Sequence, residues 1–221
     1  FLARYKSEFG NELESLNIGG GVGIAYTESD KPMNAKEFLA NVKEAINSES
    51  ARAGITTPKI SIEPGRALIG PSMVTLYTVG TTKEVQLKDG ATRLYVSVDG
   101  GMSDNIRTSL YGAVYSAAIA NRESNAKLRD CRIVGKHCET GDIVINSINL
   151  PSDIAPGDLI AVPATGAYGR SMASNYNHVP RPGVISVVNG TARTIIRSET
   201  EADLLALDVV EAPQRLSKES K

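Results

Sequence analysis

The pattern of the chain changes at about Met73, and this change limits the folds that the 221 residues can adopt. Before this point the sequence predicts an amphipathic segment at the start, a short strand at residues 16–18, a helix over 34–53 and a strand at 59–63. Asn34 is suited to the N-cap of the helix and Gly54 to its end. A strand, a helix and a strand at this spacing predict a parallel crossover unit.

After Met73 the predicted elements are mostly short strands, rich in β-branched residues and separated by Gly, Pro, Asn and Asp. They cover residues 74–79, 93–98, 129–134, 142–148 and 158–163. The dipeptide Asn189-Gly190 predicts a type I′ turn between strands at 184–188 and 191–197. Thr200 caps a last predicted helix over 200–207, and the tail at 217–221 is expected to fray. The sequence thus predicts an α/β domain over residues 1–73 and an all-β domain over 74–221, whose last segment could pack back on the first.

The charge and the cysteines exclude several classes of protein. The formal net charge of −1 provides no basic field for nucleic acid or an anionic membrane, and no apolar run reaches the roughly 20 residues of a membrane helix. Two cysteines are too few for the disulfide framework of a small secreted domain, which favours a reducing compartment, the cytoplasm by default. The chain starts at Phe1 without an initiating Met or a signal-peptide pattern, so we expect an internal start.

Two polar segments follow the predicted strands of the first domain. The glycines at residues 19–21 could close backbone N–H groups around a phosphate, although a steric turn would use the same residues. The segment Glu63-Pro64-Gly65-Arg66 lies at the carboxyl end of a predicted strand, where α/β folds gather functional groups. Its carboxylate could keep a pyridine nitrogen protonated and its guanidinium could clamp a phosphate or carboxylate, and a surface ion pair is the alternative.

Two further segments follow strands of the second domain. The turn-rich residues 99–105 lead into Arg107 and Tyr111, which would share a face if a helical turn follows and could then contact a carboxylated ligand. The loop at residues 166–177 is rich in Gly, Ser, Asn and Tyr, and its Tyr168 could offer a hydroxyl to a phosphate. An ordinary polar loop remains the alternative for both segments.

The segment around Cys138 combines a thiol with a neighbouring carboxylate, Glu139. A thiol can deliver a proton and a carboxylate can pair with a substrate ammonium group. One Cys next to one His lacks the spacing of a closed zinc site, so we expect no metal. A cysteine can also serve as a small buried apolar residue.

In their order along the chain, these segments resemble the diaminopimelate decarboxylases, a family of pyridoxal-phosphate enzymes. The stretches 63–66, 99–107, 135–142 and 166–182 are similar to family signatures, and the resemblance covers almost the whole chain. It implies the last part of a (β/α)8 barrel followed by a C-terminal domain like a β-sandwich or barrel. It also implies decarboxylation of meso-2,6-diaminopimelate to L-lysine, the last step of lysine biosynthesis.

The resemblance implies a role for each matching residue. Cofactor-binding residues would be Gly20, Gly21, Glu63, Pro64, Gly65, Arg66 and Tyr168, and substrate-binding residues would be Arg66, Arg107, Tyr111, Glu139 and Tyr168. Cys138 would donate the proton that replaces the lost carboxylate. Cys138 and Glu139 would reach the site across a homodimer interface.

The family's cofactor-binding lysine belongs to an earlier part of the barrel, and no lysine of this chain matches it. We therefore expect the chain to be the C-terminal half of the enzyme and to be inactive alone. Two alternatives stay open at this point: an ornithine or arginine decarboxylase of the same fold, and a non-catalytic remnant that retains the dimerising β domain.

Overall fold

The computed structural model describes residues 1–209, so the prediction for the tail at 217–221 lies outside the described residues. Internal contacts divide the chain into two compact units, the first covering Phe1–Ala173 and the second beginning at Ser174. The domain boundary that we predict near residue 73 stays a prediction. In the part that the structure describes, no helix has the length and apolarity needed to cross a membrane.

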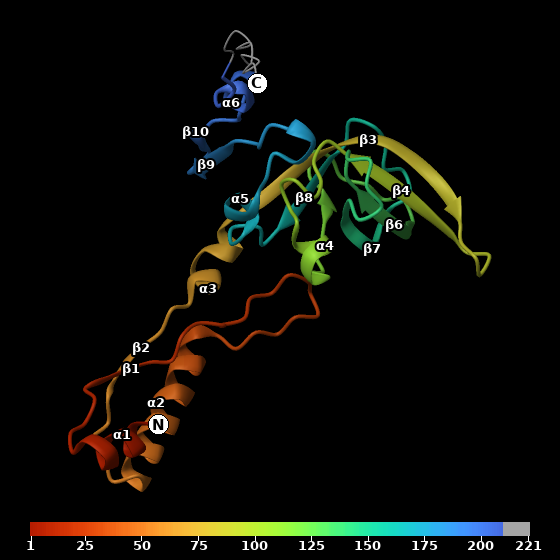
Figure 1. Cartoon of the computed structure of the whole chain (residues 1–221). Helices are drawn as coiled ribbons and strands as arrows, with labels where there is room; N and C mark the ends of the chain where they lie inside the picture. The colour runs from red at the N-terminus through yellow and green to blue at the C-terminus, as the bar shows by residue number, and fades with distance from the viewer. Residues whose placement is uncertain (210–221) are drawn as a thin grey trace, which may run out of the picture. The chain divides into compact units, whose positions relative to one another are not determined.

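The predicted crossover unit is present at the start of the chain. Helix α1 (Leu2–Phe9) precedes strand β1 (Ser15–Asn17), helix α2 (Ala35–Arg52) and strand β2 (Lys59–Ser61), and β1 pairs parallel with β2. The Asn34 side chain accepts a hydrogen bond from the Glu37 N–H at 2.9 Å, which confirms the predicted N-cap. The helix ends at Arg52, two residues before Gly54. Figure 1 shows α2 lying alongside β1 and β2.

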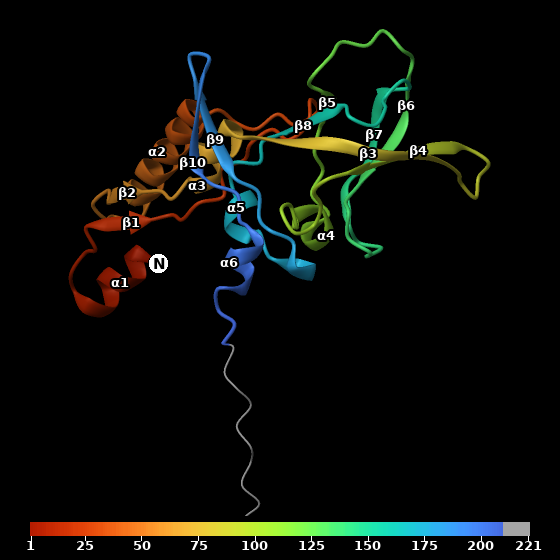
Figure 2. The ribbon, with the colours of Figure 1, turned by 90° about the horizontal axis from the view of Figure 1, so that it is seen from above.

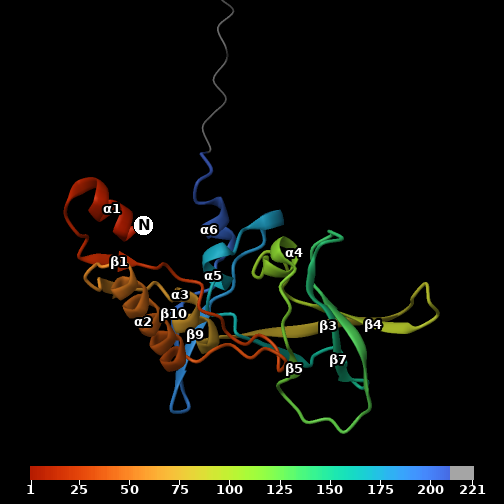
Figure 3. The same cartoon turned by 90° about the horizontal axis from the view of Figure 1, so that it is seen from below.

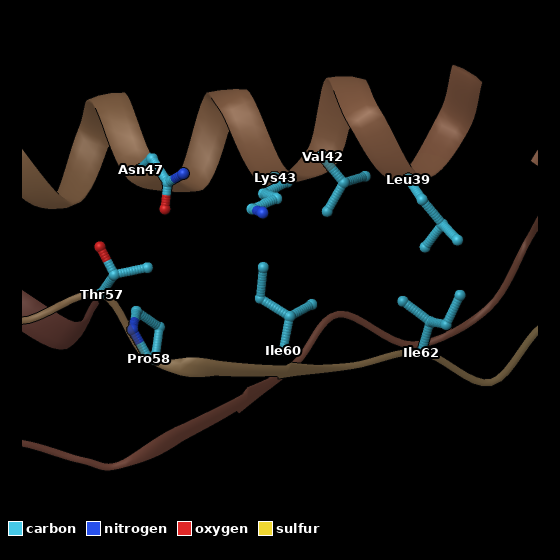
Figure 4. A pocket seen from close by; sticks show the side chains of 8 residues that line it. All are labelled: Leu39, Val42, Lys43, Asn47, Thr57, Pro58, Ile60 and Ile62. Atoms are coloured by element: carbon cyan, nitrogen blue, oxygen red, sulfur yellow. The ribbon is translucent and has the colours of Figure 1, made fainter. Parts of the chain in front are cut away.

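An apolar pocket of about 340 Å³ lies between α2 and β2. Figure 4 shows Ile60 and Ile62 pointing toward Leu39 and Val42 of the helix. Because side chains of an extended chain alternate between two faces, Ser61 and Glu63 lie on the face away from α2. Two parallel strands do not close a barrel among residues 1–209, so the barrel itself stays a prediction.

A mixed sheet of six strands forms most of the rest of the first unit. Its strands are β3 (Val74–Gln86), β4 (Thr92–Val98), β5 (Ala118–Ile119), β6 (Leu128–Val134), β7 (Ile143–Pro151) and β8 (Leu159–Pro163), in the order β5-β8-β3-β4-β6-β7. Within this six-stranded sheet, β4 and β6 pair parallel and the other neighbouring strands pair antiparallel. The expected sandwich or barrel-like domain is therefore one curled mixed sheet.

Strand β3 joins the two halves of this sheet. Its first residues, Val74 to Thr78, pair with β8, whereas Val79 to Gln86 pair with β4 across a register shift between Val79 and Thr82. Figure 2 shows β5 and β8 near the beginning of β3 and β4 near its far end. The prediction of a strand at 74–79 covered only the first half of β3.

The apolar core lies within this sheet. Its most completely buried side chains are Val79, Val96, Cys131, Ile133, Val144, Leu150, Ile160 and Val162. Helix α4 (Arg107–Tyr111) packs against the sheet, because the Thr108 hydroxyl donates to the Val144 carbonyl at 2.8 Å. Figure 3 shows α4 beside β7. It also shows the long connection that leads from β5 to β6. The sheet therefore fixes the position of α4.

The second unit contains the predicted hairpin. Strands β9 (Val184–Val188) and β10 (Thr191–Ile196) pair antiparallel, and Asn189 and Gly190 have φ values of 49° and 75°. Both positive angles confirm the type I′ turn. Helix α6 (Glu201–Leu205) follows Thr200, as predicted, and the Asp203 carboxylate accepts the Thr200 N–H at 2.8 Å.

Candidate active site

The carboxyl ends of β1 and β2 bring Glu63 and the glycine segment together. The Asn17 amide donates to Glu63 Oε1 at 2.7 Å, and the Glu63 N–H donates to the Gly19 carbonyl at 2.7 Å. A Cβ atom at Gly20 would stand 2.4 Å from the Glu63 carbonyl oxygen, so only glycine allows this approach. The Glu63 carboxylate is thereby held at a fixed place beside the glycine loop.

The glycine loop presents free hydrogen-bond donors. Within residues 1–209 the N–H groups of Gly20 and Gly21 donate to no protein acceptor, and both residues are exposed. Gly19 and Gly21 have φ values of 76° and 91°, a backbone conformation that other residues rarely adopt. Unpaired N–H groups in such a turn suit an anion such as a phosphate.

Three segments meet at the end of helix α3 (Gly65–Ile69), which begins after Pro64 and carries Arg66. A Cβ atom at Gly70 would stand 2.5 Å from Ile24 Cδ1, 3.6 Å from Arg66 Cγ and 3.8 Å from Ala167 Cβ. One residue before Ala167, the Gly166 N–H donates to the Gly70 carbonyl at 3.0 Å. The segment that follows the glycine loop, the Arg66 helix and the loop that carries Tyr168 are thus packed together.

The loop at residues 164–168 has an unusual backbone. Ala164 and Tyr168 have φ values of 60° and 65°, although neither is glycine. Such conformations cost free energy and persist where the surrounding packing requires them. Tyr168 begins helix α5 (Gly169–Met172), and its side chain is 49% exposed. The strain therefore lies at one of the predicted site residues.

Three tyrosines surround the guanidinium group of Arg107, which is only 9% exposed. Arg107 Nη1 donates to the hydroxyls of Tyr26 at 2.8 Å and Tyr115 at 2.9 Å. The Arg107 Cζ atom lies 5.1 Å from the Tyr26 ring centre, 6.0 Å from that of Tyr115 and 5.8 Å from that of Tyr168. The structure therefore brings Arg107 and Tyr168 together, while the sequence analysis missed Tyr26 and Tyr115.

The tyrosines raise the pKa of Arg107 and carry no charge that would neutralise the guanidinium group. Burial alone would lower the pKa of Arg107, but the oxygens of Tyr115 and Tyr26 more than offset it, and the pKa is raised. Burial also raises the pKa of Tyr115, although the Arg107 cation opposes the shift. A cation with neutral partners retains its full charge for an anionic ligand.

A buried carboxylate joins the Arg107 segment to the Cys138 segment. Asp142, 3% exposed, accepts the Met102 N–H at 2.6 Å and the His137 N–H at 2.7 Å. Its carboxylate fills the space beside Gly101 and Gly135, where a Cβ atom would stand 2.4 Å and 2.2 Å from it. The loop at residues 135–142 therefore has a fixed position relative to residues 99–105.

Cys138, Glu139 and Tyr111 lie at the surface of the chain. Cys138 is an exposed free thiol, so the alternative of a buried apolar filler is wrong for this residue and fits Cys131 instead. Glu139 is exposed, and Tyr111, at the far end of α4 from Arg107, is 63% exposed.

Comparisons with known proteins identify the family of the chain. Residues 33–166 match the model of a family described as pyridoxal-dependent decarboxylase, C-terminal sheet domain. The chain belongs to this family. It is 49% identical over 207 residues to diaminopimelate decarboxylase of Corynebacterium efficiens, covering 94% of this chain and 45% of that protein. It is 50% identical over 206 residues to the enzyme of the same name from Mycobacterium bovis, covering 91% and 46%.

A solved structure is similar over nearly the whole chain. Diaminopimelate decarboxylase from M. jannaschii in complex with L-lysine is 31% identical, with a TM-score of 0.84, and the match covers 96% of this chain and 46% of that one. The chain thus spans less than half the length of these relatives. Among residues 1–209 no cluster of His, Cys, Asp and Glu could hold a metal ion.

The residues of this chain fit pyridoxal phosphate, the cofactor that the family name implies. Gly20 and Gly21 offer unpaired N–H groups of the kind that a phosphate accepts, as described above. Next to them, Asn17 holds a carboxylate that could accept a hydrogen bond from a ring nitrogen. The donor set and the acceptor therefore lie together, at the ends of two parallel strands.

Proposed function

We propose that this chain is part of a longer enzyme that decarboxylates meso-diaminopimelate to L-lysine and carbon dioxide with pyridoxal phosphate. The observation that carries the proposal is the identity of about half the residues, over nearly the whole chain, with relatives named diaminopimelate decarboxylase. The likeness to a structure that contains L-lysine agrees with it. The cytoplasm is the proposed location.

In this proposal the ends of β1 and β2 hold the cofactor. The N–H groups of Gly20 and Gly21 would donate to its phosphate, and the Glu63 carboxylate, held by Asn17, would accept a hydrogen bond from the ring nitrogen and keep that nitrogen protonated. Pro64 and Gly65 start the helix that directs Arg66 toward the same site. The protonated ring supplies a sink for the electron pair left by departing carbon dioxide.

The substrate-binding groups come from two loops and two short helices. Arg107 pairs with a carboxylate of the substrate, since the guanidinium is buried, charged and free of any protein carboxylate within residues 1–209. Arg66 and the Tyr168 hydroxyl contact both cofactor and substrate. Two contacts support these roles. Arg66 and Ala167 both lie beside Gly70, and Arg107 Cζ lies 5.8 Å from the centre of the Tyr168 ring.

Cys138 and Glu139 complete the site of a second subunit. We infer a homodimer with shared active sites because the resemblance implies that Cys138 and Glu139 act across an interface, and both residues are exposed on this chain. Glu139 pairs with the distal ammonium group, and Tyr111 contacts a substrate carboxylate. Cys138 Sγ gives its proton to the carbon that lost the carboxylate.

The test uses the intact polypeptide purified with pyridoxal phosphate. We expect carbon dioxide and L-lysine to form from meso-diaminopimelate faster than carbon dioxide forms from ornithine or arginine. A preference for ornithine or arginine would move the protein to another member of the fold. No carbon dioxide from any of the three substrates would reject the catalytic proposal.

A further inference from the structure

One edge of the Arg107 guanidinium group is held by protein and the other edge is not. Both tyrosine hydroxyls bind the same nitrogen, Nη1. Arg107 Nε is buried and has no hydrogen-bond partner, and Nη2 donates to no acceptor within residues 1–209. A buried donor without a partner costs free energy, so this edge is built for a ligand.

The free edge has the geometry of a carboxylate site. Nε and Nη2 point in the same direction, and a carboxylate can accept two parallel hydrogen bonds from such a pair. With Nη1 engaged by Tyr26 and Tyr115, the guanidinium group cannot rotate to offer its other edge. The two hydroxyls therefore select one way of binding.

The two tyrosines are themselves firmly placed. Tyr115 is 2% exposed, and its ring meets the Tyr26 ring edge-on with the centres 5.3 Å apart. The Tyr26 carbonyl accepts the N–H of Ser116 at 3.1 Å and its hydroxyl at 2.9 Å. Both hydroxyls thus have fixed positions before any ligand binds, which reduces the entropy lost on binding.

We propose that Tyr26 and Tyr115 are positioning residues that hold Nη1 of Arg107 so that its Nε–Nη2 edge binds the substrate carboxylate that is not lost. This inference rests on the proposed function. Tyr26 and Tyr115 would thereby favour amino acids with a second carboxylate. An amino acid whose single carboxylate is lost in the reaction offers no anion to the Nε–Nη2 edge.

The experiment replaces each hydroxyl in the full-length enzyme with its cofactor. Tyr26→Phe, Tyr115→Phe and the double variant keep the rings, and so the packing, but remove the acceptors. Tyr95→Phe is a matched control, because the Tyr95 hydroxyl accepts Arg132 Nη1 at 3.1 Å in the sheet, with Arg132 Cζ 5.5 Å from the ring centre. Melting temperatures check that all variants fold.

We expect KM for meso-diaminopimelate to rise about tenfold in each single variant, the lower end of what one hydrogen bond to a charged group contributes, with kcat within about twofold. The inhibition constant of pimelate, a dicarboxylate without amines, should rise by a similar factor. The inhibition constant of cadaverine, a diamine without carboxylates, should not change, and Tyr95→Phe should leave all three values unchanged.

The outcomes separate this inference from the proposed function. If the wild type turns over meso-diaminopimelate but the double variant leaves KM and pimelate inhibition within about twofold, the inference is overturned. If the wild type lacks that activity, calorimetric binding of pimelate decides: binding that weakens in the double variant supports the inference, and no binding, or unchanged binding, overturns it. Equal weakening of pimelate and cadaverine would indicate a general structural role and would also overturn it.

Discussion

Replacing Asp142 with Asn tests how the structure fixes the Cys138 loop. The two carboxylate oxygens accept two different N–H groups, Oδ1 from Met102 and Oδ2 from His137. An amide has the same shape but only one oxygen, so in either orientation its NH2 group faces a backbone donor. Gly101 and Gly135 surround the carboxylate too closely for the side chain to move away.

The cost follows from this count of hydrogen bonds. The variant loses one hydrogen bond to a charged group and leaves one buried N–H without a partner, together about 3 kcal/mol. An equilibrium constant changes tenfold for each 1.4 kcal/mol. The population in which the two loops separate should therefore rise roughly 100-fold. Because Cys138 follows His137 directly, we also expect kcat of the full-length enzyme to fall.

Hydrogen exchange measures the opening at the two amides concerned. In the full-length protein, peptides that contain Met102 and His137 should exchange roughly 100-fold faster in Asp142→Asn. Asp99→Asn is the control, since the exposed Asp99 side chain accepts, among residues 1–209, only the Thr78 N–H, at 2.8 Å, and an amide oxygen can replace that acceptor. A change below about fivefold in Asp142→Asn, or an equal effect of Asp99→Asn, would refute this account.

Three further predictions concern single positions. Gly166→Ala should destabilise the protein by several kcal/mol and abolish activity, because its Cβ would stand 1.9 Å from the Ile69 carbonyl oxygen, whereas Gly169→Ala meets no atom within 4 Å and should melt like the wild type. Cys138→Ala should lower kcat at least 100-fold with KM nearly unchanged, and a preserved kcat would remove the thiol from proton transfer. Hydrogen bonds from Arg181 lower the pKa of Glu199 from 4.5 to about 2, so its stabilisation should be complete above pH 4.5 and disappear toward pH 2. The difference in thermal stability between wild type and Glu199→Gln should therefore shrink as pH falls below 4.5, and a constant difference would contradict this.

Local signals in the sequence predicted local structure well. Asn34 caps its helix through a donor three residues away, and Asn189-Gly190 needs only its own two φ angles to form the turn. The resemblance to the family placed Arg107 and Tyr168 at one site, and in the structure Arg107 Cζ lies 5.8 Å from the centre of the Tyr168 ring. In each case the chemistry of the residue itself, or of a motif, carried the information.

Residues that act through distant partners were not predicted. Tyr26 lies 81 positions from Arg107 and Met102 lies 40 from Asp142, and no periodicity connects such pairs. Asp142 was assigned to the start of a strand, yet β7 begins at Ile143 and Asp142 serves as the link between two loops. Strand β3 also extends past 79, because its second half is stabilised by pairing with β4, which the local sequence does not reveal.

The continuity of β3 restricts how the length of this chain can change during evolution. One half of the strand pairs with β8 and the other with β4, so the number of residues between the halves sets the register of one pairing relative to the other. Losing one residue between Val79 and Thr82 would invert the faces of every later side chain relative to the core, since strand side chains alternate. Insertions and deletions should therefore accumulate in the connections, such as that from β5 to β6, and be purged from the middle of β3.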